Sequence, residues 1–146
     1  MTDNYVLLVE DNPDEVLLTQ RAFKRSQVSN KLVVVTDGRQ ALDFLFRRDG
    51  HANRDAGDKP VLILLDLNLP LVSGLNVLKE VRANPDTSRI PVIVLTSSSE
   101  ERDRSESYRL GANDCICKPT GFSHFIEVIQ QVKTKWLSLP SGQDSN

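Results

Sequence analysis

Short apolar segments alternate with longer amphipathic ones along this chain. The short segments consist of aliphatic and often β-branched residues, and they are apolar on both faces. This pattern is typical of the buried strands of a parallel sheet. There are five such segments: Tyr5–Val9, Leu32–Val35, Val61–Leu65, Pro91–Leu95 and Cys115–Cys117.

Helical patterns with start signals lie between these predicted strands. Asn12 is a suitable cap for a first helix, with Glu15 at its third position, and Gly38 opens a second. Ser73 can cap a third helix, which the Asn-Pro pair at 84–85 ends. The last helix has the most regular spacing of apolar residues. They are Phe122, Phe125, Ile126, Ile129, Val132 and Trp136.

The predicted fourth helix differs from the others in its polarity. Ser98 with Glu101 is a capping-box pattern, and the helix is expected to end near Gly111. Its residues are mostly charged or small, and Tyr108 is the one large residue with an apolar ring. A helix of this kind makes few core contacts, so we expect it to be the most weakly held and the most easily moved.

The alternation of strands and helices predicts an α/β fold, namely one doubly wound parallel sheet with helices on both faces. The chain has 146 residues, which suffices for one domain with a core but not for two ordinary domains. We assign residues 1–138 to the domain and expect 139–146 to be a disordered polar tail. The polar stretch 47–60 is expected to form a long loop before the third strand.

Composition excludes several classes of protein. The chain carries 18 basic and 20 acidic residues, a net charge of −2, which gives no basic surface for nucleic acid and no polybasic membrane signal. The longest apolar run, Val61–Leu65, is too short to span a bilayer. Two cysteines make no disulfide framework, so we expect a protein of the reducing cytoplasm.

Polar residues gather at the predicted carboxyl ends of the strands, where open parallel sheets bind ligands. Glu10 and Asp11 follow the first strand, Asp66 the third, Thr96 the fourth and Lys118 the fifth. Each residue alone is as well explained by a helix cap or a loop. Together, three carboxylates repel one another unless a cation joins them, and oxygen ligands of this kind suit Mg²⁺. The hydroxyl and the ammonium could hold phosphoryl oxygens, and a carboxylate can accept a phosphoryl group.

Four motifs stand at these strand ends: Leu7–Asn12, Leu64–Pro70 with Gly74, Val94–Thr96 and Lys118–Pro119. In their order and spacing they resemble the receiver domain of two-component response regulators, and the resemblance covers Tyr5 to Leu137. It implies a flavodoxin-like fold with five parallel strands in the order 2-1-3-4-5.

Within that family the chain looks most similar to the small, stand-alone response regulators of cyanobacterial phytochromes. The segments 66–70 and 89–96, the polar loop before the third strand and Trp136 carry this similarity. It implies a phytochrome-type histidine kinase as partner. The weakly held fourth helix and the apolar last helix make the face of the fourth helix, fifth strand and fifth helix the expected exit for the signal. We expect a homodimer or a contact with the kinase there, tightened by phosphorylation.

The resemblance implies metal ligands at this edge of the sheet. Asp11 and Asp66, together with the main-chain carbonyl of Asn68, would bind Mg²⁺, and Glu10 would act through a water molecule.

It also implies how a phosphoryl group would be bound. Asp66 would be the phosphoacceptor, Thr96 would bind the phosphoryl group and draw the next loop inward, and Lys118 would pair with it. The Lys118–Pro119 bond would be cis. Such a domain is a signalling switch that gains and loses one phosphoryl group, and it is not a turnover enzyme.

One position departs from the family pattern. Receivers commonly carry Tyr or Phe three residues before the lysine, whereas this chain has Cys115. The signal would then travel through the loop after Thr96 and the fourth helix, without the usual aromatic. Trp136 either anchors an interface on this face or packs back on its own domain.

Two other classes compete with the receiver interpretation. A Mg²⁺-dependent hydrolase of the haloacid-dehalogenase type also uses an aspartyl nucleophile, but it carries an Asp-x-Asp pattern after the first strand, where this chain has Glu10–Asp11. A pseudo-receiver would require a broken acceptor site, and here the site is complete in sequence.

Overall fold

The computed structural model describes residues 5–46, 59–67, 69, 72–96, 101–118 and 122–137. Most of the 47–60 loop, the cap Ser98 and the tail 139–146 lie outside the described residues. The strands are β1 (Tyr5–Val9), β2 (Lys31–Val35), β3 (Leu62–Asp66), β4 (Val92–Thr96) and β5 (Asp114–Cys117). The helices are α1 (Pro13–Arg25), α2 (Gly38–Leu45), α3 (Gly74–Ala83), α4 (Glu101–Arg109), α5 (Phe122–Val132) and the π-helical turn η2 (Lys133–Leu137).

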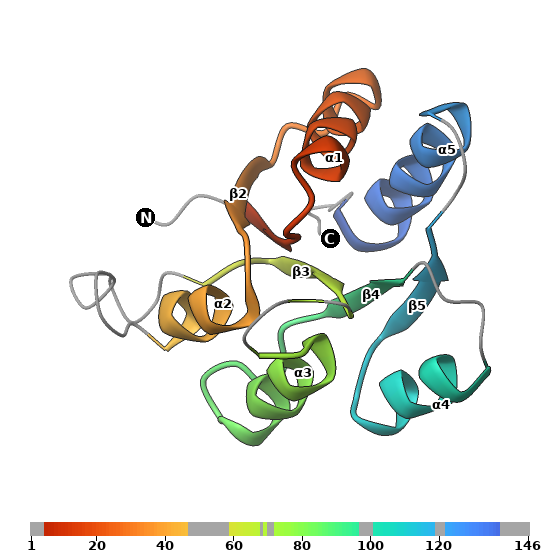
Figure 1. The fold of residues 1–146 in the computed structure, drawn as a ribbon. Coiled ribbons are helices and arrows are strands. Elements are labelled where there is room, and N and C mark those ends of the chain that lie inside the picture. Colours follow the sequence, from red (N-terminus) through yellow and green to blue (C-terminus); the bar gives the residue numbers. More distant parts are fainter. Residues whose placement is uncertain are drawn as a thin grey trace, which may run out of the picture.

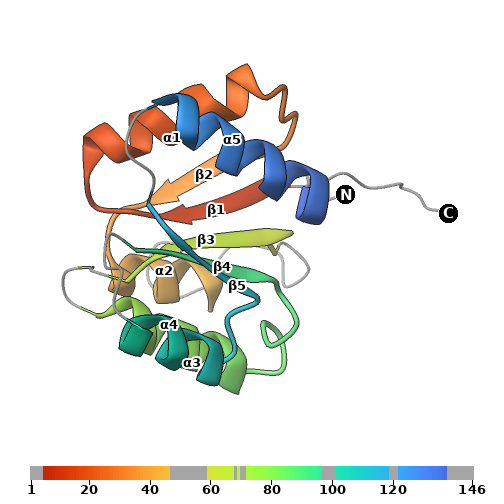
Figure 2. The same ribbon diagram turned by 90° about the vertical axis from the view of Figure 1, so that its right-hand side faces the viewer.

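The five strands form one parallel sheet in the order β2-β1-β3-β4-β5. Helices α1 and α5 cover one face, and α2, α3 and α4 cover the other (Figures 1 and 2). The predicted fold class and strand order are therefore confirmed. The strands β3 and β4 begin and end one residue later than their apolar pattern predicts, so Asp66 and Thr96 are the last residues of their strands.

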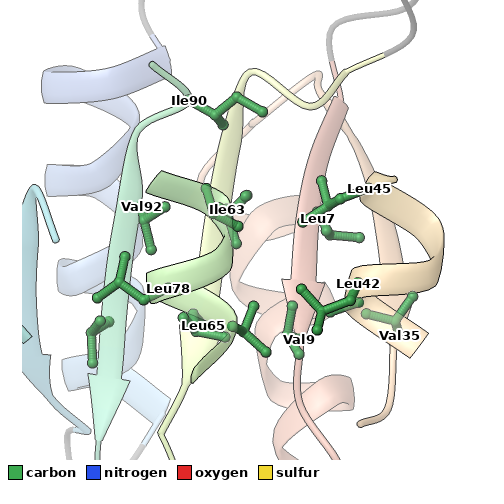
Figure 3. Close-up of a cluster of buried hydrophobic side chains, with 14 of the residues drawn as sticks. Leu7, Val9, Val35, Leu42, Leu45, Ile63, Leu65, Leu78, Ile90 and Val92 are labelled. Atoms are coloured by element: carbon green, nitrogen blue, oxygen red, sulfur yellow. The ribbon is translucent and has the colours of Figure 1, made fainter. Parts of the chain in front are cut away.

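Two hydrophobic clusters, one on each face, hold the sheet between its helices. Alternate residues of a strand point to opposite faces, so Leu7 and Ile63 belong to the cluster under α2 and α3 (Figure 3). Their neighbours Leu8 and Leu62 belong to the cluster under α1 and α5. This explains why the strands are apolar at successive positions.

Side-chain caps fix the beginnings of α1, α2 and α3. The Asn12 carboxamide oxygen accepts from the amides of Asp14 (2.9 Å) and Glu15 (3.4 Å), and Ser73 accepts from the amide of Asn76 (3.2 Å). These caps agree with the sequence prediction. For α2 the cap is Asp37, which precedes the predicted first residue.

The last helix is less regular than its apolar spacing predicts. It is α-helical to Val132 and then widens into the π-helical turn η2. Trp136 and Leu137, both in that turn, pack against the cluster under α1 and α5. Trp136 therefore packs back on its own domain, with Lys135 Nζ 5.6 Å from the centre of its ring.

The fourth helix buries few of its side chains, as the sequence predicts. Ser107 is the one buried side chain of α4, and Tyr108 is 44% exposed.

None of the described helices is long and apolar enough to cross a membrane.

Candidate functional site

The carboxyl ends of the sheet bring the predicted polar residues to one edge. Asp66 and Thr96 end β3 and β4 and are buried, and Glu10 directly follows β1 and is also buried. The main chain continues the strand pairing here, because the Glu10 amide donates to the Val35 carbonyl (3.0 Å) and the Lys118 amide to the Thr96 carbonyl (2.7 Å). The polar side chains are therefore positioned by the sheet itself.

Three carboxylates form a compact cluster at this edge. One oxygen from each of Glu10, Asp11 and Asp66 lies within 4.8 Å of the others. Glu10 and Asp66 are buried whereas Asp11 is exposed, so one side of the cluster is open to solvent. Hard oxygen ligands with room for water and a phosphate are what Mg²⁺ requires, and the residues present fit such an ion.

Lys118 lies beside this cluster. Its Nζ is 3.0 Å from Glu10 Oε1 and 3.3 Å from Asp66 Oδ2, and it also forms an ion pair with Glu15. Burial alone would lower the pKa of this amine, but the hydrogen bonds to Glu15 and Glu10 and the charge of Asp66 outweigh it and raise the pKa above the ordinary 10.5. Lys118 is therefore charged, and it partly neutralises the acids around it.

The environment of Glu10 is less favourable to charge. Burial raises the pKa of Glu10 from 4.5 to about 7, against the opposing hydrogen bond from Lys118, and the Asp66 carboxylate adds to the rise. Two neighbouring acids that are both buried repel each other unless a cation joins them. The electrostatics of the cluster thus favour an added positive charge.

Close backbone packing holds the start of α3 against the end of β3. The Gly74 amide donates to the Leu67 carbonyl (3.0 Å). A Cβ at Gly74 would lie 2.3 Å from the Asp66 carbonyl oxygen and 2.6 Å from the Leu67 Cα. Only glycine permits α3 to begin this close to the end of β3.

The structure brings together Glu10, Asp11, Asp66 and Lys118, with Thr96 at the end of the neighbouring strand. Two residues of the predicted set, Asn68 and Pro119, lie outside the described residues, so the metal-ligand carbonyl and the cis bond stay predictions.

Sequence reasoning missed the role of Glu15. Glu15 stands at the third position of α1, where the side chain of a capping box accepts from the amide of the cap residue. That amide instead donates to Glu10 Oε2 (3.2 Å), and the Glu15 side chain pairs with Lys118. A contact between residues 15 and 118 leaves no local signal in the sequence.

A cysteine, Cys115, stands three residues before Lys118, where receivers commonly carry Tyr or Phe. Cys115 is buried and is a free thiol, and Cys117 is exposed and also free. Burial raises the pKa of the Cys115 thiol. The hydroxyl of Tyr108 on α4 and the guanidinium of Arg104 reach the main chain of Cys115 from outside the sheet.

This fold, with an acid cluster and a lysine at its carboxyl edge, is the arrangement expected of a receiver domain. Comparison with protein families agrees: the chain belongs to the response regulator receiver domain family, whose model matches residues 6–130. It is thus a receiver-domain response regulator of a two-component system.

Similar proteins include response regulators linked to phytochromes. The chain is 39% identical over 132 residues to the response regulator Rcp1 of Synechocystis sp., covering 90% of this chain and 88% of Rcp1. It superimposes on the phosphorylated cyanobacterial phytochrome response regulator RcpA with a TM-score of 0.86 at 37% identity, covering 97% and 98% of the two chains. The Mn²⁺-bound form of Rcp1 gives a TM-score of 0.83 at 38% identity, with 92% and 94% covered.

Proposed function

We propose that this protein accepts a phosphoryl group from a histidine kinase on the carboxylate of Asp66. The observation that supports this most directly is the placement of Asp66. Its buried carboxylate ends the central strand, 3.3 Å from the Lys118 ammonium and within a cluster of three acids. A nucleophile, a charge for the phosphoryl oxygens and candidate metal ligands thus meet at one point.

The transfer needs little beyond positioning and charge. An oxygen of Asp66 forms a bond to phosphorus while the bond from phosphorus to the kinase histidine nitrogen breaks and that nitrogen keeps the electron pair. Lys118 neutralises charge on the phosphoryl oxygens, and the Thr96 hydroxyl donates a hydrogen bond to one of them. Water later attacks the acyl phosphate and returns Asp66 to its carboxylate form.

Glu10, Asp11, Asp66 and the main-chain carbonyl of Asn68 would hold a divalent cation, and we propose Mg²⁺. When bound, it would place positive charge next to the phosphoryl oxygens. The solved structure of Rcp1 with Mn²⁺ supports a divalent cation in this family. The short distances within the acid cluster of this chain support the same site here.

The donor is proposed to be a phytochrome-type histidine kinase in the cytoplasm, because the chain is similar over most of its length to Rcp1 and RcpA. The output is proposed to leave through the face of α4, β5 and α5, with a homodimer formed there. The small number of core contacts of α4, which has a single buried side chain, supports this choice. Sedimentation with and without beryllofluoride and Mg²⁺ tests the dimer.

The phosphoacceptor is tested with the wild type, Asp66→Asn and the control Asp86→Asn, whose carboxylate lies on the surface after α3. Each is incubated with acetyl phosphate and Mg²⁺, and the intact mass is measured. Wild type and control should gain one phosphoryl group, and Asp66→Asn none. Labelling of Asp66→Asn at the wild-type rate would refute the assignment. Release of many equivalents of phosphate per chain would instead favour a hydrolase.

Transfer from kinases is tested by mixing the protein with phosphorylated phytochrome-type and unrelated histidine kinases. Transfer should be fastest from the phytochrome type. Equal or faster transfer from the unrelated kinases would refute the proposed partner and leave the role of Asp66 standing.

A further inference from the structure

Lys118 contacts one carboxylate that is not part of the acid cluster. Glu15 lies in the first turn of α1, and its Oε1 forms an ion pair with Lys118 Nζ. The two side chains are 33% and 16% exposed, so solvent screens the pair less than a surface pair. Lys118 thus links the end of β5 to α1 as well as to Glu10 and Asp66.

Glu15 is firmly placed by the start of its helix. Its amide donates to the Asn12 carbonyl (3.1 Å) and lies 3.4 Å from the Asn12 side-chain oxygen. Its carbonyl accepts from the hydroxyl of Thr19 (2.8 Å), which is buried. The main chain of Glu15 therefore stays in place when Lys118 moves away, and the carboxylate stays within reach of the site.

The ammonium of Lys118 cannot fully satisfy Glu15 and a phosphoryl group together. A phosphoryl group on Asp66 brings about two negative charges next to the oxygen that is now 3.3 Å from Lys118 Nζ. Turning Lys118 toward that group lengthens or breaks its contact with Glu15. The Glu15 carboxylate also repels the incoming charge.

We propose that Glu15 is a positioning residue that holds Lys118 in the unphosphorylated protein and competes with the phosphoryl group for it. This inference rests on the proposed roles of Asp66 and Lys118. Its consequence is that Glu15 makes the phosphorylated state less stable and the switch easier to reset.

The space around the pair permits such a change of partner. A cavity of about 110 Å³ adjoins Glu15 and Lys118 between α1 and α5, and its apolar wall includes Leu18, Leu95 and Phe125. The Lys118 side chain therefore has free volume beside it, and its ammonium can change partner without displacing the residues of this wall.

The experiment measures binding of beryllofluoride, a phosphoryl mimic, in the presence of Mg²⁺. Glu15→Gln keeps the size of the side chain and removes the competing charge. We expect it to bind beryllofluoride about two- to fivefold more tightly than the wild type. Asp14→Asn is the matched control, because Asp14 is an exposed neighbour in the same turn; it should bind within about 1.5-fold of the wild type.

Two further measurements separate the ion pair from simpler explanations. Glu15→Asp keeps the charge but is one methylene shorter, so it should shift beryllofluoride affinity in the same direction as Glu15→Gln. Mg²⁺ alone should bind Glu15→Gln no more tightly than the wild type, because removing a nearby negative charge does not favour a cation. A purely structural role would weaken the binding of both ligands.

Failure of the proposed function and failure of the inference about Glu15 give different results. If the wild type itself does not bind beryllofluoride with Mg²⁺, the proposed function fails. If the wild type binds it and Glu15→Gln binds equally or less tightly, the competition is refuted and the function stands. If Glu15→Gln binds more tightly but Glu15→Asp matches the wild type, the effect is one of charge and the contact with Lys118 is not its cause.

Discussion

The hydroxyl of Tyr108 on α4 accepts a hydrogen bond from the main-chain amide of Cys115 on β5, at 3.2 Å, and donates one to Asp114 Oδ1, at 3.1 Å. β5 is an edge strand, and Arg104 donates to the Cys115 carbonyl (3.4 Å). Two side chains of α4 thus cover the open edge of β5 at the position where the family commonly carries an aromatic. An edge covered in this way is protected from pairing with another chain.

The first prediction concerns this attachment. Tyr108→Phe keeps the ring and removes both hydrogen bonds of the hydroxyl. Because Asp114 Oδ1 still accepts from the Cys115 amide (2.9 Å), the loss of stability should be small, about 0.5–1.5 kcal/mol. The amides of α4 and β5 should nevertheless exchange with deuterium faster than in the wild type, because the hydroxyl joins these two elements.

The matched control is Arg109→Gln, which breaks an ion pair with Glu106 within α4 and makes no contact with β5 that the structure describes. It should leave exchange in β5 unchanged. Equal exchange of α4 and β5 amides in Tyr108→Phe and the wild type would show that the hydroxyl does not hold the helix.

The second prediction concerns the two thiols. Cys117 is exposed, whereas Cys115 is buried and burial raises its pKa. Since the thiolate is the reactive form, Cys115 should be the slower thiol at neutral pH, and its reactivity should rise only at a pH above that of an ordinary thiol.

The native protein should therefore react with one equivalent of a thiol reagent quickly and with a second only after unfolding. Cys117→Ser should remove the fast phase and Cys115→Ser should leave it. Loss of the fast phase in Cys115→Ser would mean that the buried thiol is the reactive one.

The third prediction concerns Arg82, which joins three segments on the α3 side of the sheet. Its guanidinium donates to the carbonyls of Gly111 (2.9 Å), Ile90 (2.8 Å) and Ser88 (3.1 Å) and to Asn113 Oδ1 (2.7 Å). Arg82→Met should lower the free energy of unfolding by about 2–4 kcal/mol, because three part-buried carbonyls lose a charged donor.

Arg82→Lys should recover only a part of this, since one ammonium cannot reproduce the planar fork. Arg39→Met serves as the control, because the Arg39 side chain is 69% exposed and its ion pair with Asp43 is long, at 4.0 Å. Urea denaturation measures all four proteins. A loss of less than about 0.5 kcal/mol in Arg82→Met, the range of surface changes, would refute this role.

The fold was predictable because its main determinants are local. Strands buried on both faces are apolar at successive positions, and caps such as Asn12 and Ser73 mark helix starts directly. The strand boundaries were off by one residue at β3 and β4, because Asp66 and Thr96 are polar yet still pair with their neighbours.

The acids of the candidate site were predictable for a different reason. Parallel strands end at one edge, so Glu10, Asp11 and Asp66 had to lie close together. The contacts that could not be predicted join elements that are far apart in the sequence, and each depends on how far one side chain extends. The pair of Glu15 with Lys118, the Arg82 network and the hydroxyl of Tyr108 all depend on tertiary geometry that the local pattern does not carry.

The π-helical turn after Val132 is a further example. A continuous helix through Trp136 is the simpler interpretation of the apolar spacing, and the structure corrects it. Lys133 Nζ donates to the Ser26 carbonyl (3.0 Å) at the end of α1. This contact fastens the turn to α1 and joins two residues that are 107 positions apart in the sequence.

The last prediction concerns two glycines that lie in close contact with main chain between β3 and α3. A Cβ at Gly74 would lie 2.3 Å from the Asp66 carbonyl oxygen, and one at Gly38 would lie 2.0 Å from that of Val72. Both contacts are with backbone, so Gly74→Ala and Gly38→Ala must each shift main chain and should lower the melting temperature.

Of these two glycines, only Gly74 touches the residue that we propose as phosphoacceptor. Among molecules that remain folded, Gly74→Ala should therefore be phosphorylated by acetyl phosphate about tenfold more slowly than Gly38→Ala, because small displacements of a reacting group are costly. Rates are measured well below both melting temperatures and are compared with Asn76→Ala, an exposed position in α3. Equal rates in the two glycine variants would mean that the contact of Gly74 with Asp66 supports the fold alone and does not position the carboxylate.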